Sequence, residues 1–325
     1  MKKILNIFVV SFALVFSSNL FANKIGVIYD SGGKFDKSFN ELAFRTAERV
    51  KNELGWDMIE FEAANNTQIE QGMRKVADRG ATLVVAMGFA QADAVAAIAP
   101  QYPDINFVAV DVCWVDDPAG NIYQACYLEH EGSFLVGVIA AMASKTGTIG
   151  FVGGMDIPLI RKFQGGYEQG ALYANPDIKI LANMTGTTPE AWNNPTKGAE
   201  LTKAQIDGGA DVVYQAAGGT GIGVLQAAAD AGIYGIGVDT NQNWMHPGSM
   251  LTSMLKRLDL TIFEQAEKTA AGTFEPGINI LGLAQGMVGY ATEDGMVTDE
   301  MAAAADAAAA GIIDGSISVA DWSQE

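Results

Sequence analysis

Short apolar segments alternate with longer amphipathic segments along the first part of the chain. The run KIGVIYD at residues 24–30 has the length and composition of a strand, and residues 38–54 follow with helical spacing. The same order returns over residues 57–80 and 82–103, and apolar strand segments recur over residues 106–128. Because strands this uniformly apolar are buried on both faces, the pattern predicts a parallel sheet with helices on each side.

The alternation starts again near residues 127–131, and we interpret this restart as the boundary between two lobes. Further strands are predicted over residues 148–154, 178–186, 211–218, 233–239 and 249–255. Helices are predicted over residues 130–145, 162–175, 194–209, 223–232 and 257–275. The alanine-rich tail at residues 291–315 is predicted to be a final helix. Two such series in tandem predict an α/β protein with two doubly wound lobes.

Polar residues and glycines gather where the predicted strands end. Asp30, Asp111 and Asp239 each end a strand, and the glycine-rich stretch at residues 218–223 follows another. Ligands of open parallel sheets bind at the carboxyl ends of the strands. Two lobes whose strand ends face each other would therefore form one cleft, which closes by hinge motion.

The loop after the first strand, DSGGKFDKSFN, carries more polar and aromatic side chains than a turn requires. Asp30, Phe39 and Asn40 suit a flat polar heterocycle, because the ring can stack while the polar groups bind its edge. The alternative is local: Asp36 or Ser38 caps the following helix and Phe39 belongs to the core. Capping does not explain Asp30, Phe39 and Asn40 together.

The stretch AAGGTGIGVLQAAADAG at residues 216–232 takes a strand through glycines into a helix. Such a turn lets the backbone approach a ligand closely. The dinucleotide fingerprint GxGxxG fails, because Val224 stands where the third glycine belongs, and no GK[ST] phosphate loop is present. The stretch favours a neutral polar ligand, with phosphate binding or a plain tight turn as alternatives.

Four further residues are candidates for the cleft. Asp239 at a strand end could bind a pair of hydroxyls, as on a sugar, or act as a cap or turn residue. Lys256 lies beyond the next strand, and its alternative is a solvated lysine. Trp192, in a polar loop, could cover a ring from the other lobe or be a partly buried surface residue. Phe89, at another strand end, is expected to line the cleft.

The N-terminal residues 1–22 have the pattern of a secretory signal peptide. Lys2 and Lys3 precede an apolar core, and a plausible cleavage point follows Ala22. No cysteine stands at that point, so we expect no lipid anchor. The formal net charge of −18 argues against a nucleic-acid partner and is consistent with a charge that keeps the chain soluble.

The chain has only two cysteines, Cys113 and Cys126. In an oxidising compartment a closely spaced pair can bridge, and both lie near predicted strand ends, so we favour a disulfide over two buried free thiols. The two cysteines and the chain's two histidines, His130 and His246, are too few and too scattered for a zinc site. We expect no metal and no cofactor.

The sequence gives little support for a catalytic function. The sequence contains no GxSxG, no HExxH and no convincing Ser/His/Asp order. A nucleoside hydrolase would use clustered acidic residues after the first strand, but here two glycines separate Asp30 from Asp36. We therefore expect a binding protein, and a nucleoside hydrolase or a dehydrogenase stays an alternative.

Five stretches in chain order carry a family resemblance: VIYDSGGKFDKSFN, FVAVDV, GADVVYQAAGGTGIGVLQAA, GIYGIGVDTNQ and LTSMLKR. Together they resemble the basic membrane protein family, solute-binding components of ABC transporters of which several members bind purine nucleosides. The resemblance extends over nearly the whole mature chain, and AAGGTGIGV and IGVDTNQ are its most specific parts.

The resemblance implies a type I periplasmic-binding-protein fold, with two Rossmann-like lobes joined by three hinge crossovers. On this basis we expect lobe I at residues 23–128 and about 256–284, and lobe II at residues 129–255 and about 285–325. The implied function is that of a periplasmic receptor that closes like a Venus flytrap on a purine nucleoside or nucleobase. We expect it to act as a monomer that serves ABC-transporter permease subunits. A sugar or signalling ligand that feeds a sensor is the alternative.

The resemblance also implies roles for the base-binding residues. Phe39 is expected to stack on one face of the base, and Trp192 stands about where members carry an aromatic residue for the other face. The base edge is expected to hydrogen-bond with Asp30, Asn40 and Asp111.

For the sugar, the resemblance implies that Asp239 and Lys256 bind the ribose hydroxyls, with the backbone of Gly218 and Gly219 close by. Two departures from the family matter. Many members are lipoproteins, whereas this chain lacks the lipidated cysteine, which suggests a free periplasmic protein. Trp192 and the following NNP differ from a Phe-x-Asp-Pro pattern, and the larger indole could change which base fits.

Overall fold

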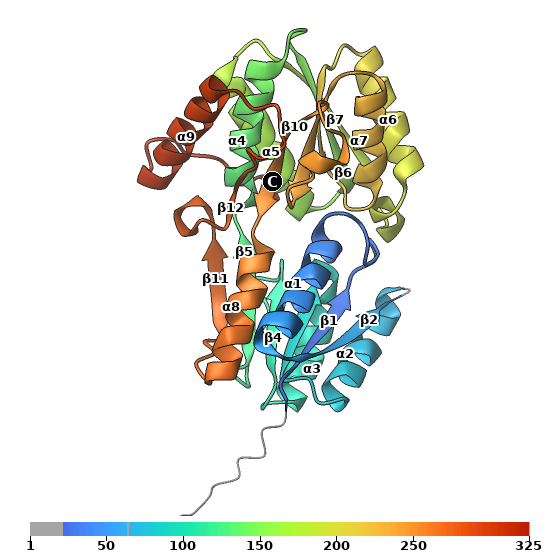
Figure 1. The fold of residues 1–325 in the computed structure, drawn as a ribbon, viewed down its shortest axis with the longest axis vertical. Helices are drawn as coiled ribbons and strands as arrows, with labels where there is room; N and C mark the ends of the chain where they lie inside the picture. The colour runs from blue at the N-terminus through green and yellow to red at the C-terminus, as the bar shows by residue number, and fades with distance from the viewer. Residues whose placement is uncertain (1–21, 64, 325) are drawn as a thin grey trace, which may run out of the picture.

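The computed structural model describes residues 22–63 and 65–324, and it shows two α/β lobes, one above the other (Figure 1). The predicted signal peptide at residues 1–22 lies outside the described residues, apart from its last position. Each lobe contains a six-stranded sheet covered by helices on both faces. The fold class predicted from the sequence is confirmed.

Lobe I, the lower lobe in Figure 1, has the strand order β11-β5-β4-β3-β1-β2, and all neighbouring strands are parallel. Its strands are β1 (Lys24–Tyr29), β2 (Asp57–Glu62), β3 (Leu83–Met87), β4 (Asn106–Val110), β5 (Ile122–Tyr127) and β11 (Gly277–Leu281). Its helices are α1 (Phe39–Leu54), α2 (Ile69–Asp78), α3 (Ala92–Ile98) and α8 (Leu258–Ala271). Helices α1 and α8 pack together on one face, and α2 and α3 cover the other.

Lobe II has the order β12-β10-β9-β8-β6-β7, in which only β12 runs antiparallel to its neighbour among the described strands. Its strands are β6 (Thr148–Met155), β7 (Lys179–Gly186), β8 (Val212–Ala216), β9 (Tyr234–Asp239), β10 (Met250–Lys256) and β12 (Val288–Tyr290). Its helices are α4 (Glu129–Ala143), α5 (Pro158–Ala174), α6 (Pro195–Asp207), α7 (Thr220–Asp230) and α9 (Asp299–Asp314). Helix α9 packs outside α4.

The chain crosses between the lobes three times, from β5 into α4, from β10 into α8 and from β11 into β12. These crossovers gather on one side of the molecule, and the carboxyl ends of the central strands point toward the opposing lobe (Figure 1). A fold of this kind places residues from distant parts of the sequence around one inter-lobe space.

The sequence pattern missed β11 and β12. Strand β11 is an edge strand whose outward side chains, Ile278 and Ile280, are more than half exposed, and β12 has only three residues. Strand β11 also joins a sheet whose other strands come much earlier in the chain, within residues 24–127. The helix predicted at residues 257–275 ends earlier, at Ala271, because Gly272 adopts the left-handed conformation with φ of 67°.

Candidate ligand-binding cleft

A cavity lies between the lobes and contains about 540 Å³ of space not filled by atoms, part of it open to solvent. Pockets for small organic ligands commonly measure about 300–1,000 Å³. Eight predicted contact residues line it: Asp30, Phe39, Phe89, Asp111, Trp192, Gly218, Asp239 and Lys256. The other two, Asn40 and Gly219, are not among its lining residues.

Asp30 points one carboxylate oxygen, Oδ2, toward the cavity, and its other oxygen, Oδ1, is hydrogen-bonded within the protein. Its Oδ1 accepts hydrogen bonds from Asn40 Nδ2 at 2.5 Å and from the backbone N–H of Gly32 at 2.8 Å. Burial raises the pKa of Asp30, while these two hydrogen bonds lower it. Asn40, which is fully buried, therefore positions Asp30 from behind instead of lining the cavity itself.

Asp36 caps helix α1, as one reading of the sequence proposed. Its carboxylate accepts hydrogen bonds from the backbone N–H groups of Ser38 at 2.9 Å, Asn40 at 3.0 Å and Glu41 at 3.1 Å. Burial nevertheless raises the pKa of Asp36 to about 8. The loop is thus fixed by its own polar groups, which sets the place of Phe39 at the first position of the helix.

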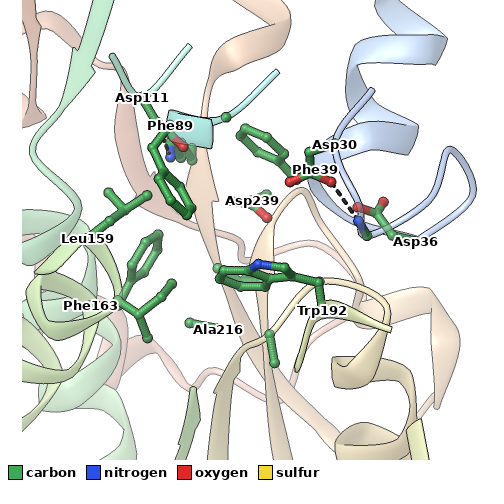
Figure 2. A pocket seen from close by; sticks show the side chains of 17 residues that line it. Asp30, Asp36, Phe39, Phe89, Asp111, Leu159, Phe163, Trp192, Ala216 and Asp239 are labelled. Carbon is green, nitrogen blue, oxygen red and sulfur yellow. Dashed lines mark hydrogen bonds and ion pairs between the residues drawn. The ribbon is translucent and has the colours of Figure 1, made fainter. Parts of the chain in front are cut away.

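Aromatic side chains approach the cavity from both lobes. Figure 2 shows the Phe39 ring and the Trp192 indole on opposite sides of the space, with Asp239 visible between them. The indole lies against Gly154 of β6, where a β-carbon would come within 2.3 Å of the ring. A glycine at this position is what allows the large indole to lie on the strand. Phe89 and Phe163 complete the aromatic lining.

Lys256 is buried at the end of β10, where it joins the two lobes electrostatically. Its Nζ lies 2.6 Å from Asp111 Oδ1 and 3.0 Å from Glu129 Oε1, and Lys162 Nζ lies 2.8 Å from Glu129 Oε2. Burial lowers the pKa of Lys256, but the carboxylates of Asp111, Glu129 and Asp239 outweigh it and raise the pKa above its ordinary value. The predicted alternative of a solvated lysine is wrong.

The two carboxylates of this network differ in pKa. Burial raises the pKa of Asp111 to about 6, although Lys256 opposes the change. Burial also raises the pKa of Glu129, but Lys162 and Lys256 outweigh it and hold the value at about 2. An ammonium has three N–H donors, so the two ion pairs of Lys256 leave one donor for a further partner.

Asp239 ends β9 in the left-handed conformation, with φ of 65°, and Asp111 directly follows β4 with φ of 62°. Asp239 Oδ2 accepts a hydrogen bond from Ser38 Oγ at 2.5 Å. Burial raises the pKa of Asp239, while Lys256 and Ser38 lower it. Its Oδ1 receives no hydrogen bond from the described part of the chain.

Sequence reasoning missed several residues of the site, among them an apolar group on α5 and an acidic residue on α4. Leu159, Ile160 and Phe163, in the first turns of α5, form an apolar side of the cavity, and Glu129 anchors Lys256. Helix α5 follows β6, whose carboxyl end faces the cleft, so its first turns could have been placed there from topology. Glu129 carries no comparable signal, because only the crossover geometry brings it to Lys256.

Cys113 and Cys126 are joined as a disulfide, with Cα atoms 5.7 Å apart. Within residues 22–63 and 65–324, no cluster of three or more histidine, cysteine or acidic residues is placed to hold a metal ion. In the same ranges, no helix is long and apolar enough to cross a membrane.

Comparison with known proteins agrees with this architecture. The family described as ABC transporter substrate-binding protein PnrA-like matches residues 22–322. Basic membrane protein A of Borreliella burgdorferi is 34% identical over 285 residues, which is 86% of this chain and 82% of that protein. A protein of Lactococcus lactis named as an ABC transporter nucleoside-binding protein is 32% identical over 319 residues, 91% of this chain and 88% of its own.

Among solved structures, an ABC-transporter solute-binding protein of Aeropyrum pernix is similar with a TM-score of 0.82 and 26% identity, covering 92% of this chain and 93% of that one. The fold, the family match and the relatives therefore all indicate the same family. The chain belongs to the Bmp family of PnrA-like ABC transporter substrate-binding proteins.

Proposed function

We propose that this receptor captures a purine nucleoside, or a related nucleobase compound, in its inter-lobe cavity for an ABC importer. The observation that carries the proposal is the pair of aromatic side chains, Phe39 and Trp192, on opposite sides of one cavity (Figure 2). A flat heterocycle between them would be covered on both faces. Base–aromatic stacking contributes about 1–3 kcal/mol per base, which makes it the main source of affinity.

The base edge would be read by carboxylates of lobe I. Asp30 Oδ2 is the oxygen left free by Asn40 and Gly32, and Asp111 lies on the same cavity. A ligand without N–H groups at these points would leave a buried carboxylate unpaired, which costs more than the missing hydrogen bond itself. Selectivity among heterocycles would thus come from donors on the base edge.

The ribose would bind where Asp239 Oδ1 and the remaining donor of Lys256 meet the cavity. A carboxylate accepts from two neighbouring hydroxyls, and an ammonium donates to their oxygens. Gly218 lines the same cavity next to Trp192 and has φ of 55°, so its backbone can approach a ligand where a larger residue would be strained.

A thermal-shift panel with calorimetry tests this function. The panel contains adenosine, guanosine, inosine, cytidine, uridine, the free bases and ribose. A ligand at a hundred times its dissociation constant adds about 2.7 kcal/mol of stability, which is easily measured. We expect shifts with purine nucleosides. Shifts with free bases alone would remove the ribose contacts, and a response to sugars alone would replace the nucleoside by a sugar.

We further propose that the mature chain is a free periplasmic monomer without catalytic activity, which delivers its ligand to permease subunits. The supporting observations are the signal-peptide pattern without a cysteine at the cleavage point and the membership of a substrate-binding family. Unchanged inosine after prolonged incubation with the protein is the expected result, and release of free base would contradict it.

A further inference from the structure

Hydrogen bonds connect the loop before α1 in lobe I directly to the end of β9 in lobe II, outside the crossovers. Ser38 Oγ donates to Asp239 Oδ2 at 2.5 Å and lies 3.2 Å from Val238 O. Gln242 Nε2 donates to the backbone oxygen of Lys37 at 2.9 Å. Lys37 and Ser38 precede α1 in lobe I, whereas the other three residues lie at or just after the end of β9 in lobe II. These bonds exist only while the lobes are together.

Gln242 is held in one orientation by its own lobe. It is fully buried, and its Oε1 accepts from the backbone N–H of Val238 at 2.9 Å and from Gln215 Nε2 at 2.8 Å. Its backbone N–H donates to Ser253 Oγ at 3.0 Å. With its acceptor and backbone satisfied inside lobe II, the donor Nε2 is fixed and faces Lys37. Pre-organisation of this kind reduces the ordering cost of forming the inter-lobe bond.

The backbone on both sides supports the same contact. Lys37 has φ of 63° and Asp239 has φ of 65°, and only two other non-glycine residues in the described ranges have positive φ. Such conformations are strained for residues with a β-carbon, and they persist at clamps and switches where the surroundings hold them. Here they point the Lys37 carbonyl at Gln242 and set the Asp239 carboxylate against Ser38.

We propose that Lys37 and Ser38 of lobe I and Asp239 and Gln242 of lobe II form a latch that favours lobe closure independently of the ligand. Ser38 and Gln242 act as positioning residues. Because Asp239 gives Oδ2 to the latch and also lines the cavity, the ligand and the latch share one carboxylate. The latch must break before the ligand leaves, so it governs the dissociation rate and the population of closed, empty receptor.

Two variants remove the hydrogen bonds of the latch. Ser38→Ala deletes one hydroxyl. Gln242→Glu keeps an acceptor for Val238 and Gln215 but replaces the donor facing Lys37 by an oxygen. The matched control is Gln205→Glu, since Gln205 is also buried in lobe II but its Nε2 bonds only within that lobe, to Phe151 O and Asn183 Oδ1.

Small-angle scattering of the ligand-free proteins is the first measurement. We expect Ser38→Ala and Gln242→Glu to be more open than the parent, with Gln205→Glu unchanged. If Gln242→Glu does not fold, Ser38→Ala alone decides. Parent and latch variants of equal dimensions without ligand would overturn the proposal.

Stopped-flow kinetics with a purine nucleoside is the second measurement, and it alone rests on the proposed function. We expect dissociation to be roughly 2- to 10-fold faster in Gln242→Glu, as for the loss of one neutral hydrogen bond, with the association rate unchanged. In Ser38→Ala we expect it to be roughly 10- to 150-fold faster, because this variant removes a hydrogen bond to a carboxylate. Unchanged dissociation rates would overturn the coupling to the ligand. Absence of nucleoside binding in the parent would count against the proposed function, and the scattering result would still decide the latch.

Discussion

The two walls of the cavity differ in chemistry. Lobe I presents three carboxyl groups, Asp30, Asp36 and Asp111, together with two phenylalanines. Lobe II presents mainly apolar side chains and small residues: Leu159, Ile160, Phe163, Trp192, Ala216, Ala217, Gly218 and Val238. Asp239 and Lys256 are its polar exceptions. We infer that lobe I discriminates between ligands through donors on their edges, while lobe II covers whatever lobe I has selected.

The polar exceptions of lobe II are the residues that contact lobe I directly. Lys256 pairs with Asp111, and Asp239 accepts from Ser38. The division into a polar and an apolar wall is therefore coupled to closure, because the polar groups of lobe II complete their bonding only when the lobes meet. Five experiments test this comparison, beginning with the largest expected effect.

Lys256→Met should have the largest effect. Removing one member of a buried ion network leaves Asp111 and Glu129 without their shared partner, which costs about 3–5 kcal/mol of stability. Urea unfolding measures the loss. Lys268→Met is the control, because that lysine is partly exposed and its ion pair is with Glu264, one helical turn away. Equal effects of the two substitutions would contradict the role of the network.

Glu129→Gln should lower stability by roughly 3 kcal/mol at neutral pH, from the lowering of its pKa from 4.5 to about 2. A carboxyl group with a lowered folded-state pKa contributes stability that is present above pH 4.5 and lost as the pH falls toward 2. The parent and the variant should therefore converge at low pH in urea unfolding. A constant difference from pH 7 to pH 2 would show that the stabilisation does not come from ionised Glu129.

Asp30→Asn tests whether the lobe I wall of the cavity discriminates between ligands. A hydrogen bond to a charged group is worth about 1.5–3 kcal/mol, so affinity for nucleosides with a base-edge donor should fall by roughly 10- to 150-fold. Calorimetry measures the change, and Asp57→Asn, at the exposed first position of β2, serves as control. If all nucleosides lost affinity equally, Asp30 would be supporting the loop and not reading the base.

Phe39→Ala and Trp192→Ala test whether both faces of the ligand are covered. Each should cost about 1–3 kcal/mol of binding free energy, or roughly 5- to 150-fold in affinity. Exposed aromatic residues outside the cavity, Phe35 and Trp114, provide matched alanine controls. A large loss in only one of the two cavity variants would reduce the sandwich to a single stacking face.

Gly154→Ala tests the lobe II wall of the cavity and is the smallest of these changes. The added methyl group would lie 2.3 Å from the Trp192 ring, so the indole must shift. We expect a loss of affinity of less than about tenfold, roughly 1.4 kcal/mol, that is larger for purine than for pyrimidine nucleosides. Unchanged affinity for both classes would mean that the indole position does not limit the fit.

The sequence predicted the fold well because its central strands are strongly apolar and its helices periodic. Eight of the ten residues predicted for the site line the cavity, and three of these, Asp30, Asp111 and Asp239, stand at strand ends, where parallel sheets bind ligands. What it could not predict depends on side-chain competition and on distant contacts. Asn40 is turned away from the cavity by its bonds to Asp30 and Asp36.

The ion pairs around Lys256 also could not be predicted from the local sequence pattern. Lys256 was identified from the sequence, but its partner Glu129 lies far away in the chain, at the first position of α4. Nothing in the local pattern around Glu129 distinguishes it from an acidic residue at a helix start, which would usually be solvated. Only the crossover from β5 into α4 buries it beside Lys256.

A crystal structure of the chain grown with inosine or adenosine would test the central claim most directly. The account predicts the purine ring between Phe39 and Trp192, an edge donor on Asp30 Oδ2, and the ribose beside Asp239 and Lys256. A nucleoside bound elsewhere, or one with its ribose between the two aromatic rings, would contradict it.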